Sequence, residues 1–283
     1  MKQIVFYFLL FYVQVFSQNY GKAIYSVKMD DSFEIDENIL KEYLYRAKQS
    51  SDDVKFVLDF NNNETLFYHD FLEKDGTDVK FVLMFCGYTT QIYSDLKEKQ
   101  CYYNNSETIF FKKNQYLIKK PTLNNWEITN ERKVIGDLNC YKAICDYEIF
   151  NSRGKFTHKA VAWYCPDIPV QGGPKEFGNL PGLIVELHNK NVTFGLEKIN
   201  FYKQNEIFVT KPSEGIKIDF YSFNELVKEK LKLKSGSKVP QKDKVGHLTF
   251  QQLKEIAEQK IVNMNAVDIA GAMLTIDGTA RQM

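Results

Sequence analysis

Residues 172–187 read GGPKEFGNLPGLIVEL, with glycines and prolines first and a short apolar run after them. Pro181 has a fixed φ and no backbone donor, and Gly182 can adopt a positive φ, so residues 180–182 are predicted to form a tight turn that leads into a strand. The flanking segments 160–166 (AVAWYCP) and 192–201 (VTFGLEKINF) alternate as strands do. The pattern predicts a strand, an irregular crossover, a strand, a hairpin and a strand.

The composition indicates a folded chain rich in β structure. The 283 residues are 44% hydrophobic, which is enough for a substantial core, and 14% aromatic, which favours strands over a helical bundle. The formal net charge is +1, so no global field draws the chain to nucleic acid or to an anionic membrane. The basic and aromatic segment 110–120 (FFKKNQYLIKK) is explained by a strand with outward lysines, and no nucleic-acid partner is expected.

Short alternating segments joined by polar turns predict many strands. They cover residues 23–29, 54–60, 64–69, 79–85, 89–94, 99–103, 108–112, 115–120, 126–129, 131–135, 140–150 and 156–164. Because no helical pattern interrupts the run from 54 to 164, the strands are expected to pair antiparallel. The predicted fold is mainly β (α+β), with a single twisted antiparallel sheet or half-barrel.

Three helices accompany the predicted sheet. Apolar residues at helical spacing predict an amphipathic helix over 36–49. Capping boxes at Ser222 and Thr249 predict two more helices, over 223–234 and 250–263.

The ends of the chain suggest three parts. Residues 1–18 have the anatomy of a secretory signal peptide with cleavage near Gln18, and no later segment is predicted to span a membrane. Residues 19–204 form the predicted β domain. Residues 205–283 form a helical extension with a solvated linker over 234–246. The protein is therefore expected to be exported, to the periplasm or the outer membrane.

The segment 179–184 (NLPGLI) resembles the hexapeptide for which the GLPGLI family is named, with Asn179 in place of its first glycine. Asn tolerates a left-handed backbone, so the turn is expected to survive. Further matches to the family are the segments 54–67, 135–136 and 140–143, and the strand 162–164 with the prolines that follow it. The resemblance implies an exported protein of Gram-negative bacteria, from a family whose biochemical role is not established.

The predicted order of elements is also similar to the half-barrel of periplasmic lipoprotein carriers, which hold acyl chains in an apolar concavity. This is an analogy between folds, which by itself says little about function.

Export would permit disulfides, and the chain has an odd number of cysteines: Cys86, Cys101, Cys140, Cys145 and Cys165. Cys86 could pair with Cys101, and either Cys140 or Cys145 could meet Cys165 across the sheet; the spacing does not decide between them. The four histidines are far apart in sequence, so neither a metal site nor a cofactor is expected.

No set of catalytic residues stands out, since the chain contains neither a nucleophile elbow nor a phosphate-binding loop. A hydrolase would have to use Glu176 with Glu186 as a carboxylate pair, or Cys165 with His158 or His188.

The crossover carries a more informative apolar group, which could either fill the core or form a ligand or partner surface. Its members are Trp163, Tyr164, Phe177, Leu180, Pro181, Gly182, Leu183 and Ile184. The expected function is non-enzymatic binding of an apolar ligand or an envelope protein. The alternatives are the hydrolase and a structural accessory of an outer-membrane assembly.

Overall fold

The computed structural model describes residues 20–30, 38–70, 77–108, 110–151, 154–203, 206 and 209–230, and the single positions Ala257 and Met273. The predicted signal peptide (1–18), the linker (234–246) and the helix 250–263, apart from helical Ala257, lie outside these residues.

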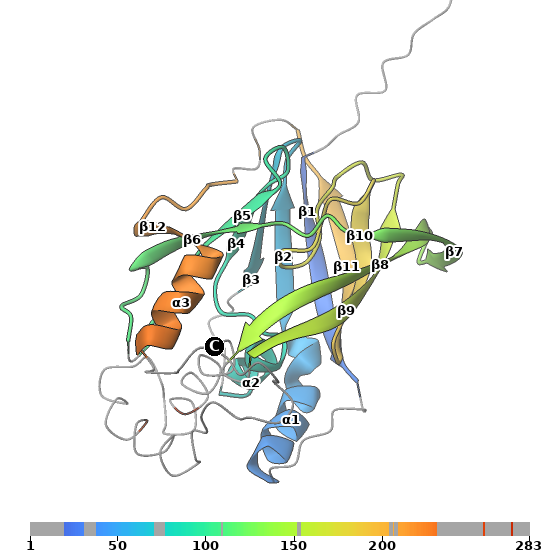
Figure 1. Ribbon diagram of the computed structural model, residues 1–283. Coiled ribbons are helices and arrows are strands. Elements are labelled where there is room, and N and C mark those ends of the chain that lie inside the picture. Colours follow the sequence, from blue (N-terminus) through green and yellow to red (C-terminus); the bar gives the residue numbers. More distant parts are fainter. Residues whose placement is uncertain are drawn as a thin grey trace, which may run out of the picture.

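One open sheet of twelve strands organises the described chain (Figure 1). Its strands are β1 (Gly21–Met29), β2 (Lys55–Phe60), β3 (Glu64–His69), β4 (Ile92–Asp95), β5 (Gln100–Asn104), β6 (Tyr116–Pro121), β7 (Glu127–Ile135), β8 (Leu138–Asn151), β9 (Gly154–Cys165), β10 (Leu183–Asn189), β11 (Val192–Phe201) and β12 (Ile216–Asp219). They lie in the order β12-β6-β5-β4-β3-β2-β1-β11-β10-β9-β8-β7.

The predicted mainly-β fold is confirmed, with one addition. The strands from β1 to β6 pair antiparallel in chain order, as do the strands from β7 to β11. Strand β1 joins the two series by pairing with both β2 and β11. Strand β12, which the sequence pattern does not predict, pairs parallel with β6, so the sheet is not wholly antiparallel. This strand follows residue 205, where the C-terminal extension was predicted to begin, and it belongs to the same sheet.

The helices are α1 (Asn38–Ser50), a 3-10 turn at Ser51–Asp53, α2 (Thr77–Phe85) and α3 (Phe220–Lys230). The predicted N-terminal helix is confirmed as α1. The predicted strand 79–85 is wrong, because this apolar run is α2. The ring of Phe81 stacks on Tyr43 of α1 with centroids 4.5 Å apart, and Arg46 forms an ion pair with Asp78, so helix-to-helix packing decides the conformation.

Three further predictions need correction. Thr108 and residues 110–112, which the structure describes, form no strand, because the Thr108 hydroxyl accepts hydrogen bonds from the backbone N–H groups of Phe110 and Phe111. The two strands predicted over 126–135 are the single strand β7, with an irregular register between Ile128 and Arg132. Helix α3 begins three residues before its predicted start, because Asp219 rather than Ser222 accepts the first free N–H groups of the helix.

The crossover between β9 and β10 lies over the sheet, within the main core. Gly172 packs so closely that an added Cβ would lie 2.9 Å from Thr65 of β3 and 3.5 Å from Leu58 of β2. The indole of Trp126 donates to the Gly178 carbonyl (2.8 Å), and Gly182 N–H donates to Leu180 O (2.8 Å), which confirms the predicted tight turn. Within the described residues, no helix has the length and apolarity needed to cross a membrane.

Candidate functional site

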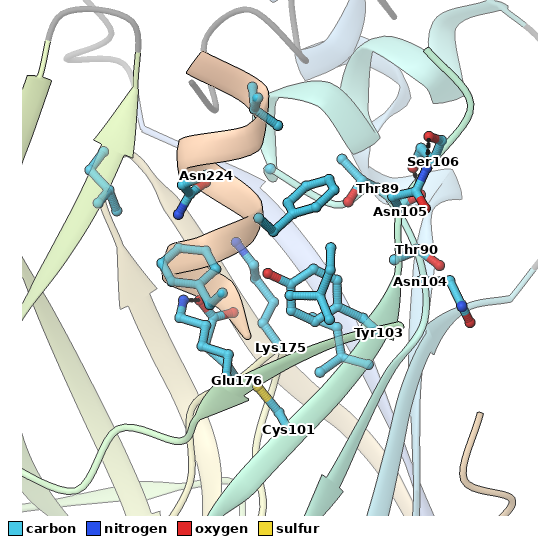
Figure 2. A pocket seen from close by; sticks show the side chains of 18 of the residues that line it. Thr89, Thr90, Cys101, Tyr103, Asn104, Asn105, Ser106, Lys175, Glu176 and Asn224 are labelled. Atoms are coloured by element: carbon cyan, nitrogen blue, oxygen red, sulfur yellow. Dashed lines mark hydrogen bonds and ion pairs between the residues drawn. The ribbon is translucent and has the colours of Figure 1, made fainter. Parts of the chain in front are cut away.

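A cavity of about 280 Å³ lies between the two halves of the sheet. One side is formed by the end of α2 and by β4, β5 and β6. The other is formed by the end of β8, by the crossover and by the turn between β10 and β11. Helix α3 supplies a further wall through Phe220, Phe223, Asn224 and Val227 (Figure 2). Strands far apart in the order of the sheet therefore share one cavity, because the sheet curls.

A largely buried ion pair lies in the cavity wall. Lys120 of β6 donates to Glu176 of the crossover at 3.0 Å, and both side chains are more than four-fifths buried. Burial alone would raise the pKa of Glu176, but the charges of Lys120 and Lys175 outweigh it and lower that pKa to about 2. Burial disfavours charge on Lys120 as well, yet Glu176 and other neighbours raise its pKa overall. Both groups are therefore charged at neutral pH.

Two more lysines line the cavity. Lys175 donates to the Cys86 carbonyl at 3.2 Å, which ties the crossover to the end of α2. Lys190 lies in the turn between β10 and β11, where loss of hydration and then the charge of Lys175 lower its pKa. Both residues have a positive φ, 59° and 57°, so each lies at a bend that directs its side chain differently from those of a regular strand.

The sequence motifs do not predict a site role for four of the lining residues, which are Lys120, Lys175, Lys190 and Asn224. The clue for Lys120 was strand periodicity, since residues two apart in a strand share a face. Lys119 lies outside, with its Nζ 5.9 Å from the centre of the Tyr102 ring, whereas Lys120 joins Ile118 in the cavity lining. The expectation that lysines of residues 110–120 all point outward is therefore wrong at Lys120.

The eight predicted surface residues are mostly inside the protein. Tyr164, Phe177, Leu180, Leu183 and Ile184 are buried in the main core, Gly182 is buried, Trp163 is half-buried and Pro181 is exposed. The cavity lining contains none of the eight, but it contains their neighbours Lys175 and Glu176. That the eight form a ligand or partner surface stays a prediction.

Asn179 confirms the expected turn and adds contacts that glycine could not make. Its φ is 62°, in the left-handed region. Its side-chain amide donates to Thr122 Oγ1 (2.8 Å) and to the Leu123 carbonyl (2.7 Å), upstream of β7. The first residue of the hexapeptide therefore also fastens the crossover to a distant segment.

The structure does not bring the candidate hydrolase residues together. Glu176 pairs with Lys120 in the cavity, whereas Glu186 on β10 binds Lys133 (2.8 Å) and His188 (2.7 Å) and does not line it. Hydrogen bonds from Lys133 and His188 outweigh burial and lower the pKa of Glu186, so it does not resemble a general acid at neutral pH. Within the described residues, no group of three or more His, Cys, Asp or Glu side chains is placed so that it could hold a metal ion.

All five cysteines lie in the described part of the chain as free, buried thiols. Burial raises the pKa of Cys165 and raises those of Cys86, Cys101 and Cys140 to about 12, which opposes thiolate chemistry. Cys140 lies beside Cys165 on the neighbouring strand, within hydrogen-bonding reach. Of the two pairings with Cys165 that the sequence allows, the structure therefore brings Cys140 rather than Cys145 next to it.

Two protein-family models match parts of the chain. One, described as a protein of unknown function (Porph_ging), matches residues 150–186, which include β9, the crossover and the NLPGLI segment. The other, described as the RNA binding domain of ribosomal protein L11, matches residues 222–283. The structure describes only 222–230, Ala257 and Met273 of that segment, and each model covers well under half of the chain.

Solved structures of PNGF-II in two space groups, P21 and C2, are similar to part of this chain. Their identities to it are 12% and 13%, the TM-score is 0.43 for both, and the alignments cover 74% of this chain. They cover 33% and 32% of the PNGF-II chains, so this chain spans about a third of the length of those structures.

Proposed function

We propose that this is an exported, non-enzymatic binding protein of the GLPGLI type that holds an apolar ligand in the cavity between the halves of its sheet. The observation that carries the proposal is the cavity itself, whose walls come from both halves of the sheet and from α3. Twelve of the twenty-six lining residues have apolar, aromatic or thiol side chains, and polar or charged groups make up nearly all of the rest. The apolar part of the lining gives a small molecule surface to bury, and the polar part can fix its orientation.

The arrangement of charged and sulfur groups supports binding rather than catalysis. The buried carboxylate in the cavity already has a cationic partner, and the thiols are kept protonated by burial. Neither group is free to act as an acid, base or nucleophile. The N-terminal sequence supports the export part of the proposal, and the NLPGLI segment of the crossover supports the family part.

The test is a fluorescence titration with the neutral apolar dye N-phenylnaphthylamine, whose emission rises in an apolar site. Wild type is expected to bind the dye saturably. Replacing Thr90, a half-buried cavity residue, by tryptophan (T90W) fills part of the space and is expected to weaken binding by about tenfold or more, by excluding the ligand from its site.

Thr210→Trp is the matched control, because Thr210 is exposed and its neighbours Val209 and Lys211 pack on Tyr102, which is on the side of β5 opposite the cavity. It should bind the dye as wild type does. No saturable binding by wild type, or equal binding by wild type and T90W, would contradict the proposed function.

A further inference from the structure

The cavity contains more positive charge than its own carboxylates can neutralise. Five charged side chains line it: Lys120, Lys175, Lys190, Glu148 and Glu176. Glu176 pairs with Lys120 (3.0 Å), and Glu148 pairs with Lys155 (2.5 Å), which is outside the lining. Within the described chain, no carboxylate lies at ion-pair distance from Lys175 or Lys190. These two ammonium groups are therefore the positive charges of the cavity that no carboxylate pairs with.

The excess charges lie near each other. Both line the same cavity. Burial and then the charge of Lys175 lower the pKa of Lys190, against a smaller opposing effect of Glu176, so the two ammonium groups lie within electrostatic range of each other. An anion placed beside them would relieve that repulsion and would be held by charge-assisted hydrogen bonds, which are the stronger kind.

Helix α3 adds an unused donor on the same cavity. The amide nitrogen of Asn224 is inaccessible to solvent and has no hydrogen-bond partner in the described structure. Figure 2 shows Asn224 on α3 above Lys175 and Glu176 in the view, and all three residues line the cavity. A buried donor without an acceptor costs stability, so an acceptor that arrives with a ligand would favour a turn of this side chain toward the cavity.

The apolar walls and the volume of the cavity indicate the chemistry and the size of the rest of the ligand. Phe85, Ile92, Phe111, Ile118, Phe223 and Val227 supply apolar surface. A volume of about 280 Å³ is at the small end of ligand sites, which matches one hydrocarbon chain better than the two chains of a phospholipid.

We infer that the ligand is a single-chain amphiphile with a carboxylate head, which Lys175, Lys190 and Asn224 bind while the chain lies against the apolar walls. The inference rests on the proposed function and specifies the class of its ligand. Binding therefore has an electrostatic component that a neutral chain of equal length lacks.

Calorimetric titrations with laurate and with dodecanol, each below its aggregation concentration, distinguish the contribution of the charged head group to binding from that of the hydrocarbon chain. Wild type is expected to bind laurate about tenfold more tightly than dodecanol, the difference that one or two charge-assisted hydrogen bonds provide. Added salt should weaken laurate binding and leave dodecanol binding unchanged, because screening acts on the charge.

Lys190→Gln and Lys175→Gln test the residues named, and Lys119→Gln is the matched control on the outer face of β6. Lys190 has no hydrogen bond or ion pair to another described residue, so K190Q should fold normally even if K175Q, which loses a bond to Cys86, does not. Each variant should weaken laurate binding several-fold without changing dodecanol binding, and K119Q should change neither.

Equal affinities for laurate and dodecanol, or an equal loss of both in K190Q, would overturn the inference and leave the proposed function standing. Failure of wild type to bind laurate, dodecanol and the neutral dye would instead overturn the proposed function.

Discussion

Replacing Gly182 by alanine is expected to lower the free energy of unfolding by at least about 3 kcal/mol, because strain and overpacking add at one position. The φ of Gly182 is 154°, a conformation that residues with a side chain rarely adopt. An added Cβ would lie 2.2 Å from the Cys165 carbonyl oxygen and 2.9 Å from Pro166 Cα. Cys165 is the last residue of β9 and Pro166 follows it, so neither backbone atom can move aside without disturbing the β9–β10 pairing.

Two control glycines separate the cost of backbone strain from the cost of overpacking. Gly136 has a φ of 59° and nothing within 4 Å of an added Cβ, so G136A should cost only the backbone penalty of about 1–2 kcal/mol. Gly195 on β11 is equally open and has no positive φ, so G195A should change stability by less than about 0.5 kcal/mol. Urea unfolding that finds G182A as stable as G195A would show that the Pro-Gly turn is not the close contact described.

Replacing Glu176 by glutamine should lower the free energy of unfolding at neutral pH by about 3 kcal/mol, since it leaves the buried ammonium group of Lys120 without its carboxylate. The lysines around it add to the cost, because Lys175 also interacts with Glu176. The control is Glu225→Gln on α3, where an exposed carboxylate pairs with Lys228 and contributes at most about 0.5 kcal/mol.

The same pair predicts a pH dependence. The pKa of Glu176 falls from 4.5 to about 2 on folding, so as the pH falls the unfolded chain takes up the proton first. The stabilisation is therefore present above pH 4.5 and is lost as the pH falls towards 2. Between about pH 5 and pH 3, wild type should lose about 2 kcal/mol more than E176Q does. Parallel losses in wild type and E176Q would contradict the assignment.

Sequence periodicity predicted most of the sheet, because alternation and turn residues are local signals. It failed at α2, where a continuous apolar run fits a strand and a helix equally well and where Tyr43 and Arg46 of α1 select the helix. It also missed β12, a short strand whose partner β6 lies about a hundred residues earlier in the chain.

The candidate site was less predictable than the fold. The motif drew attention to apolar residues, which the structure places largely in the core, whereas the cavity is lined by the charged residues Lys175 and Glu176 that precede them. Lys120, Lys190 and Asn224 reach it from three other elements. Their convergence depends on how far the sheet curls and on the position of α3. Local sequence periodicity predicts neither of these.

Native mass spectrometry of the protein, purified from its own host without detergent, tests the central claim most directly. The cavity should contain one small molecule with an apolar chain per protein chain, and T90W purified in the same way should lack it while T210W retains it. A wild-type protein that carries no such molecule, or one that T90W carries equally, would contradict the claim that this cavity is a ligand site.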